Sequence, residues 1–158
     1  MAPAEAGAVR VGDPAPDFTL PGTGERGTYT LSEERGHVVV LVFYPGDDTP
    51  VCTLQLRTYS DDFGHFDSTG AVVWALSPQD VDSHNRFSDK NGGFKFPLLA
   101  DTDKEVGRLY GVLGPVGFYR RSVFVIDADG VIRYAHRALS GLTFRPTEEL
   151  VSAVAAAR

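Results

Sequence analysis

The chain has 158 residues, of which 15 are basic and 21 are acidic, and its formal net charge is −6. This length suits a single domain over residues 1–158, with residues 1–11 as a loose leader. Because Lys and Arg form no cluster, neither nucleic acid nor a membrane surface is expected as a partner. No apolar run approaches the roughly eighteen residues of a membrane-spanning helix, and the start lacks the pattern of a secretory signal.

The sequence contains one cysteine, Cys52. It cannot form a disulfide within the chain, whereas small secreted domains usually carry a larger, even set of cysteines. A lone cysteine fits a reducing compartment. We therefore expect a cytoplasmic location.

Strand and helix patterns alternate in the first half of the chain. Residues 28–31 predict a short strand, and residues 37–43 (HVVVLVF) form a β-branched and aromatic run typical of a buried central strand. Pro45 cannot continue a strand ladder. Residues 49–66 then predict a helix, because apolar residues recur at helical spacing and Thr49 precedes a proline suited to the first helical position.

The alternation continues through the middle of the chain. Residues 71–77 (AVVWALS) predict a second buried strand. Residues 80–90 predict an amphipathic helix that ends at an Asn-Gly-Gly sequence. A short extended segment at residues 96–100 and a short helix at residues 102–110 follow.

The last part of the chain predicts a β-hairpin and a helix. Residues 122–127 and 131–138 are strand-like and flank an Ala-Asp-Gly turn. Residues 147–157 predict the closing helix, with Thr147 as its N-cap. The whole order is that of an α/β protein with a thioredoxin-like fold, in which helices flank a mixed central sheet.

The segment from Pro45 to Cys52 lies between the predicted central strand and the following helix. Residues at the carboxyl end of such a strand face the usual ligand crevice of an open α/β sheet. Cys52 falls in the first helical turn, where backbone N–H groups lack partners within the helix. These groups can stabilise a thiolate and bind an oxyanion.

The helix start alone does not suffice to activate a thiol. A free thiol with a pKa of about 8.5 is only about 3% ionised at pH 7, and lowering that pKa by two to three units needs roughly 3–4 kcal/mol. A helix terminus supplies about 0.3–1 kcal/mol, and at best about 2 kcal/mol. A cation must contribute as well. Arg121, at the entry of a predicted strand, is one candidate among several arginines.

Pro45, Thr49 and Cys52 form the pattern PxxxTxxC, which resembles the active-site motif of peroxiredoxins. The surrounding FYPGDDTPVCT is similar to the bacterioferritin comigratory protein, or peroxiredoxin Q, branch of that family. Further resemblance lies in residues 12–18, 83–87, 96–101 and 121–127. It extends over roughly residues 12–135.

The resemblance implies roles for five residues. Cys52 would be the peroxidatic nucleophile, with the Thr49 hydroxyl near the thiolate and the peroxide. Pro45 would shield the site from water, and Arg121 would supply positive charge. The backbone N–H groups of Val51 and Cys52 would hold the substrate oxygens.

The resemblance also implies a reaction and its partners. Hydrogen peroxide or an organic hydroperoxide would oxidise Cys52 to a sulfenic acid, and a thiol would then reduce it. The reductant would be a thioredoxin-like protein or a low-molecular-weight thiol. No cofactor is implied, and the protein would be a monomer or a weak homodimer.

The sequence departs from the family pattern at two positions. Arg57 stands where two-cysteine members often place a resolving cysteine, so this chain would need an external thiol to recycle Cys52. Gln55, expected among the substrate-binding residues, stands where many members carry Glu. An amide can accept a hydrogen bond from a guanidinium but brings no charge. Arg121 would then face the thiolate with less competition.

Each of these residues also has a simpler explanation. A lone cysteine is often a small buried hydrophobic residue, and an arginine such as Arg121 is often on the surface or in an ion pair. Thr49 could be only an N-cap, and Pro45 could merely end a strand.

Further expectations concern two aspartates of the motif, two aromatic residues and the histidines. We expect Asp47 and Asp48 to be solvated loop residues. Phe118 and Tyr119 could either line an access groove or pack on the sheet. The histidines show no metal-ligand spacing, so no metal site is expected; they are His37, His65, His84 and His136.

The leading hypothesis is a thiol peroxidase, and two alternatives remain. A thioredoxin-like binding or peroxide-sensing module would use the same first chemical step without efficient turnover. A disulfide oxidoreductase is disfavoured, because Thr49 occupies the first position of what would be a CxxC pair.

Overall fold

A mixed sheet forms the centre of the described part of the chain, which is residues 9–114, 117–138 and 143–158 of this computed structural model. Its strand order is β5-β4-β3-β6-β7. The strands are β3 (Val39–Phe43), β4 (Val72–Ser77), β5 (Leu98–Ala100), β6 (Ser122–Ile126) and β7 (Ile132–Arg137). Strands β3, β4 and β5 are parallel, while β6 and β7 form an antiparallel hairpin. The predicted mixed sheet is thus confirmed.

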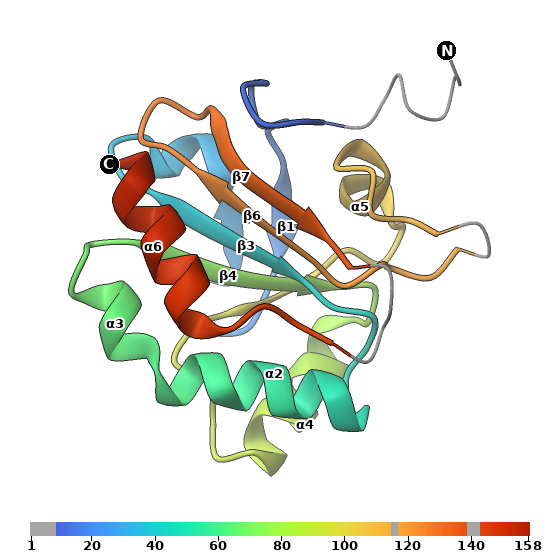
Figure 1. Cartoon of the computed structure of the whole chain (residues 1–158). Helices are drawn as coiled ribbons and strands as arrows, with labels where there is room; N and C mark the ends of the chain where they lie inside the picture. Colours follow the sequence, from blue (N-terminus) through green and yellow to red (C-terminus); the bar gives the residue numbers. More distant parts are fainter. Residues whose placement is uncertain (1–8, 115–116, 139–142) are drawn as a thin grey trace.

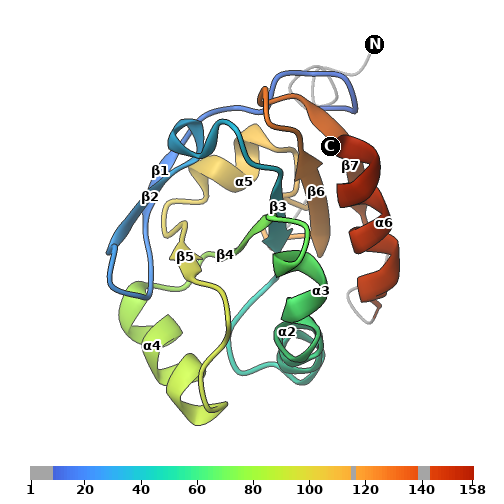
Figure 2. The same cartoon turned by 90° about the vertical axis from the view of Figure 1, so that its left-hand side faces the viewer.

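Both faces of the sheet are covered (Figures 1 and 2). Helices α2, α3, α4 and α6 lie on one face, and α5, the 3-10 helix η1 and a two-stranded sheet lie on the other. The helices are η1 (Leu31–Glu34), α2 (Pro50–Asp61), α3 (Phe63–Asp67), α4 (Val81–Lys90), α5 (Glu105–Leu109) and α6 (Thr147–Ala157). The small sheet pairs β1 (Thr19–Pro21), which the sequence did not predict, with β2 (Thr28–Thr30).

Strand β3 is buried along its whole length and contributes to both cores. Leu41 and Phe43 pack into the cluster beneath α5 and the small sheet, whereas Val40 and Val42 pack beneath α2 and α6. This follows from the alternation of side chains along a strand. A strand buried on both faces explains the uninterrupted apolar run in the sequence.

The helix predicted over residues 49–66 is interrupted at Asp62, where α2 ends and α3 begins. Asp62 has φ −91° and ψ 9°, outside the regular helical values. Its carboxylate accepts a hydrogen bond from the Thr147 hydroxyl at 2.8 Å. The sequence predicted Thr147 as the N-cap of α6. In the structure Thr147 is the first residue of that helix, and Pro146 occupies the N-cap position.

Helix α5 is shorter than the predicted helix over residues 102–110. Lys104 has φ +62°, in the left-handed region, so a regular helix begins only at Glu105. The carboxylate of Asp101 accepts hydrogen bonds from the backbone N–H groups of Val106 and Gly107, at 3.2 and 2.8 Å. These bonds supply partners for N–H groups that the first turn of the helix leaves free.

The described residues before β1 are attached to the sheet. Val9 is buried, and its carbonyl oxygen accepts a hydrogen bond from Arg137 Nη2 at 2.8 Å. The backbone N–H of Gly12 donates to the carbonyl of Ile132 at 2.8 Å. Of the leader expected over residues 1–11, residues 1–8 lie outside the described residues, and Val9 is held against the sheet by these contacts.

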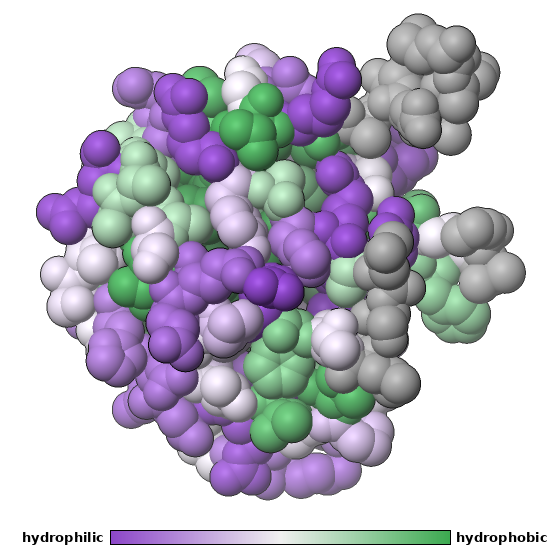
Figure 3. Space-filling model, viewed as in Figure 1, coloured by the Kyte–Doolittle hydropathy of each residue, from purple (hydrophilic) through white to green (hydrophobic). Residues whose placement is uncertain are grey.

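Hydrophilic and apolar residues are interspersed on the face of the molecule shown in Figure 3. Among the residues that the structure describes, the exposed large apolar side chains are Val11, Leu54 and Phe118. In the described ranges, no helix has the length and apolar character to span a membrane.

Gly107 makes a close approach that the fold depends on. A Cβ atom at this position would overlap the ring of Tyr119, whose hydroxyl donates to the buried carboxylate of Asp101. We expect Gly107→Ala to lower the free energy of unfolding by about 1–3 kcal/mol, as other overpacked core substitutions do. Urea denaturation measures this change.

Gly64→Ala is the matched control for that substitution. Gly64 lies in α3, and a Cβ atom there would meet nothing within 4 Å. We expect this variant to be more stable than the wild type by about 0.5–1 kcal/mol, because alanine favours a helix. If Gly107→Ala unfolded at the same urea concentration as the wild type, the Tyr119 ring would not be fixed against α5.

Candidate active site

Cys52 is the third residue of α2, just beyond the carboxyl end of β3. Its side chain is fully buried, in the apolar cluster beneath α2 and α6. The preceding loop contains Pro45, which is half-buried, and Thr49, which is exposed. The sulfur is thus enclosed by the fold, while the loop beside it reaches the solvent.

Arg121 reaches Cys52 from the neighbouring strand. Strands β3 and β6 are antiparallel, with Phe43 opposite Ser122, so Arg121 lies beside the point where the chain leaves β3. Its Nη1 donates to the sulfur of Cys52 at 3.3 Å. The arginine is 4% exposed, so water screens its charge only weakly.

Gln55 shares the same guanidinium nitrogen. Arg121 Nη1 also donates to Gln55 Oε1, at 2.6 Å. Gln55 lies one helical turn after Cys52 and is fully buried. Its amide therefore helps to fix the position of the guanidinium and brings no negative charge to this contact.

Thr49 occupies the N-cap position of α2, as predicted, with the extended backbone of such a residue. Its hydroxyl donates to the carbonyl oxygen of Gly46 at 3.1 Å instead of capping the helix. Its own carbonyl accepts the backbone N–H of Thr53 at 2.9 Å, the first bond of helical spacing. The N–H groups of Val51 and Cys52 precede that bond, at the open start of α2.

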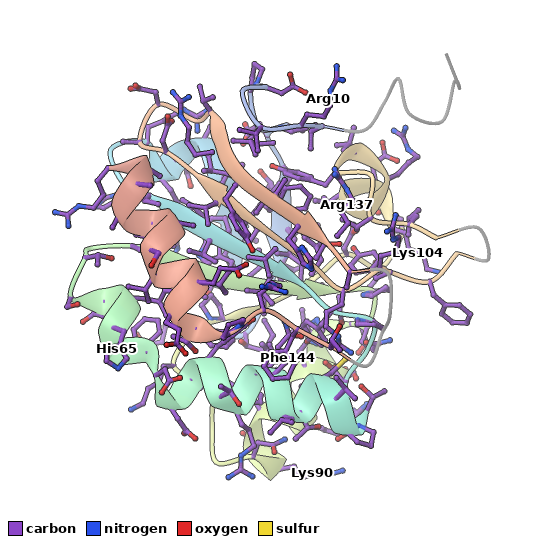
Figure 4. The ribbon with its side chains drawn as sticks, viewed as in Figure 1. Arg10, His65, Lys90, Lys104, Arg137 and Phe144 are labelled. Carbon is purple, nitrogen blue, oxygen red and sulfur yellow. The ribbon has the colours of Figure 1, made fainter. Side chains whose placement is uncertain are left out.

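Tyr59 and Phe144 enclose the site on the side of α6. Their rings lie 5.8 Å apart, edge to face, and Figure 4 shows Phe144 above α2. The Tyr59 hydroxyl donates to the carbonyl of Arg145. Burial raises the pKa of Tyr59 to about 12, so this hydroxyl stays protonated at neutral pH.

Asp47 is not a solvated loop residue, which corrects the expectation from the sequence. Its side chain is 2% exposed and accepts hydrogen bonds from the Tyr44 hydroxyl at 2.7 Å and the Ser83 hydroxyl at 2.8 Å. It also pairs with His84 Nδ1 at 2.7 Å. Burial alone would raise the pKa of Asp47, but the interaction with His84 and then the two hydroxyl bonds outweigh it and lower that pKa.

Asp48 fits the expectation better than its neighbour does. Its side chain is half-exposed and forms a surface ion pair with Lys90 at 3.1 Å. Its φ of +64° places it in the left-handed region, which aspartate tolerates better than most residues. The side chain of Asp47 is therefore buried, whereas that of the adjacent Asp48 lies at the surface.

Phe118 and Tyr119 also lie in different environments. Phe118 is 68% exposed, whereas Tyr119 is buried and its hydroxyl donates to Asp101. Tyr119 thus packs on the sheet, which settles one of the two alternatives for that residue. Its bond to Asp101 anchors the segment that leads into Arg121.

Sequence reasoning missed the pairing of Asp47 with His84. The two residues are 37 positions apart, and His84 shows no metal-ligand or catalytic spacing. One signal was available: both residues lie in segments that resemble the peroxiredoxin family. Only the fold reveals that α4 carries His84 to the loop before Cys52.

Comparisons with known proteins identify the family of the chain. A family model described as the AhpC/TSA family matches residues 11–135. The selenocysteine-containing peroxiredoxin PrxU of Peptoclostridium acidaminophilum is 40% identical over 134 residues, which are 79% of this chain and 66% of that relative.

Solved structures resemble the fold over nearly the whole chain. The bacterioferritin comigratory protein of Xanthomonas campestris, described for its alkyl peroxide reduction activity, is 29% identical with a TM-score of 0.79, covering 88% of this chain and 90% of that one. The mitochondrial 2-cys peroxiredoxin from Plasmodium falciparum has a TM-score of 0.84 at 24% identity, covering 93% of each chain, and shows the likeness of fold. The chain belongs to the AhpC/TSA family and is a thiol-dependent peroxidase of the peroxiredoxin type.

Proposed function

We propose that Cys52 is the peroxide-attacking nucleophile of this peroxidase. The observation that carries the proposal is the contact of 3.3 Å between Arg121 Nη1 and the sulfur, made at the open start of α2. A buried guanidinium and a helix start both favour the thiolate over the thiol. The site thus contains both features that the sequence led us to expect, the start of a helix and a cation beside the sulfur.

The first step transfers one oxygen atom. The thiolate of Cys52 attacks the nearer oxygen of a hydroperoxide, an S–O bond forms and the O–O bond breaks. The leaving oxygen takes a proton and departs as water or an alcohol, and Cys52 becomes a sulfenic acid. This attack needs an aligned second oxygen and stabilisation of the charge that develops on it.

The residues around Cys52 suit those needs. The N–H groups of Val51 and Cys52 at the start of α2 can donate to the peroxide oxygens, and Arg121 can stabilise the developing charge. Thr49 offers a hydroxyl at the exposed edge of the site, now bonded to Gly46. Pro45, half-buried before this loop, limits the access of water.

An external thiol completes the cycle. The chain has one cysteine and carries Arg57 where a resolving cysteine could stand. A first thiol condenses with the Cys52 sulfenic acid to form a mixed disulfide and water, and a second thiol releases Cys52 as the thiol. We assign this role to a thioredoxin-like protein or a low-molecular-weight thiol of the cytoplasm. The enzyme itself would be a monomer or a weak homodimer. Its substrates would be hydrogen peroxide and organic hydroperoxides.

The central prediction concerns Cys52→Ser. We expect stopped-flow peroxide reduction to be lost in this variant, because a serine hydroxyl is not ionised at neutral pH. Mass analysis of the wild type after one equivalent of peroxide should show the addition of one oxygen at Cys52. Equal consumption of peroxide by both proteins would sink the proposal.

A second prediction concerns Gln55→Glu. The carboxylate would lie against Arg121 Nη1 and offset its charge. We expect a smaller thiolate fraction of Cys52 at neutral pH, by ultraviolet absorbance, and peroxide reduction slowed several-fold, about what 1 kcal/mol produces.

Leu54→Glu is the control for the added charge. Leu54 lies on the same helix and is 59% exposed, so its replacement adds an equal charge where water screens it. We expect its thiolate fraction and peroxide rate to match those of the wild type. An unchanged thiolate fraction and peroxide rate in Gln55→Glu would contradict the role given to the amide.

Turnover distinguishes this enzyme from a peroxide sensor. With a thioredoxin system or a low-molecular-weight thiol present, we expect many equivalents of peroxide to be consumed per chain. A single stoichiometric oxidation without recycling, with every reductant supplied, would instead favour a sensing module.

A further inference from the structure

A second buried polar cluster adjoins the active site and has no part in the mechanism described above. It joins the end of β3, the loop before α2 and the helix α4, through Tyr44, Asp47, Ser83 and His84. Tyr44 and His84 are fully buried, and the Asp47 side chain is 2% exposed. Polar groups withdrawn from water in this way need complete hydrogen bonding.

Both ring nitrogens of His84 lie close to oxygen atoms, and Nδ1 is also 3.4 Å from the Tyr44 hydroxyl. Its Nδ1 lies 2.7 Å from Asp47 Oδ2, and its Nε2 lies 2.9 Å from the carbonyl oxygen of Leu99 in β5. A carbonyl oxygen only accepts, so Nε2 carries a hydrogen. Asp47 Oδ2 also receives the Ser83 hydroxyl at 2.8 Å. His84 thus bridges the loop and the edge of the sheet through both of its ring nitrogens.

Asp47 connects His84 to the catalytic loop. It lies two residues after Pro45 and two before Thr49. Its backbone N–H donates to Gln79 Oε1 at 2.9 Å, an atom that also accepts the Ser77 hydroxyl at 2.9 Å. The loop is therefore held through both the side chain and the backbone of Asp47.

Tyr44 brings the same cluster against the nucleophile. Its hydroxyl donates to Asp47 Oδ1 at 2.7 Å, and its ring shares the apolar cluster that contains Cys52. The ring of Tyr44 also packs near that of His84, with centroids 6.3 Å apart. Displacement of Asp47 would therefore disturb both the loop and the packing beside the sulfur.

We propose that His84 is a positioning residue of the peroxidase: its bond to Asp47 holds the Pro45–Thr49 loop in the geometry that peroxide attack requires. This inference rests on the proposed function of Cys52. Burying a carboxylate, even one that is well hydrogen-bonded, is a costly way to gain stability alone. Fixing a reacting group is a different matter, since a misplacement of about 1 Å can cost roughly 100-fold in rate.

Two amide substitutions separate the two bonds of His84. In His84→Asn the amide lies near the place of Nδ1 and can still donate to Asp47. In His84→Gln the amide lies near the place of Nε2 and keeps only the bond to Leu99. Each variant is measured twice, for peroxide reduction by stopped flow and for alkylation of Cys52 by iodoacetamide, which needs the thiolate but no alignment with the loop.

We expect His84→Gln to slow peroxide reduction by about ten-fold or more, with alkylation changed by less than about two-fold. His84→Asn should keep most of the peroxide rate. The same pair of substitutions at His65, which is exposed and projects from α3 (Figure 4), is the control and should leave both rates unchanged. Asp47→Ala breaks the same bond from the loop and should repeat the selective loss, so it carries the test if His84→Gln does not fold.

The proposal is overturned if His84→Gln or Asp47→Ala reduces peroxide at the wild-type rate. It is also overturned if peroxide reduction and alkylation fall together, or if the Asn and Gln variants at position 84 lose equal activity, because those results indicate a purely structural residue. Failure of the proposed function would look different. In that case the wild-type protein and Cys52→Ser would consume peroxide equally, before any His84 variant is compared.

Discussion

The antiparallel pairing of β3 with β6 is the constraint on which the site depends. It sets Phe43 opposite Ser122, and so places the residue before Ser122 beside the loop that leads from β3 to Cys52. A different register would move Arg121 to another position along the strand, since each residue of slip also reverses the face on which a side chain lies. The contact between the guanidinium and the sulfur is therefore a property of the sheet as much as of the two residues.

The sheet could be predicted from the sequence because its signals are local. The run of residues 37–43 and the turn between residues 127 and 131 report burial and chain reversal within a few positions. Cys52 was recognisable for the same reason, as its motif is contiguous. Arg121 is far along the chain, and only the family resemblance selected it among the arginines.

The break between α2 and α3 and the buried contact of Asp47 with His84 could not be predicted, because each depends on a partner that is distant in the sequence. The break at Asp62 coincides with a bond from Thr147, 85 positions away, and the environment of Asp47 is set by His84, 37 positions away. Apolar spacing continues through Asp62 without a break, and a loop aspartate looks solvated until α4 is packed against it. Tertiary contacts overrode the local pattern in both cases.

Two buried contacts lie beside the loop, that of Asp47 with His84 and that of Arg121 with Cys52, and a turnover affects them differently. Asp47 and His84 take no part in the oxidation of Cys52, so their bond can stay constant through a turnover. Cys52 changes its charge, because a thiolate becomes a neutral sulfenic acid and then part of a disulfide. The guanidinium of Arg121 then no longer faces an anion at the sulfur. Gln55 Oε1, at 2.6 Å from the same nitrogen, remains an acceptor at every stage. A neutral amide can do this without opposing the thiolate before it reacts, which a carboxylate at the same place could not.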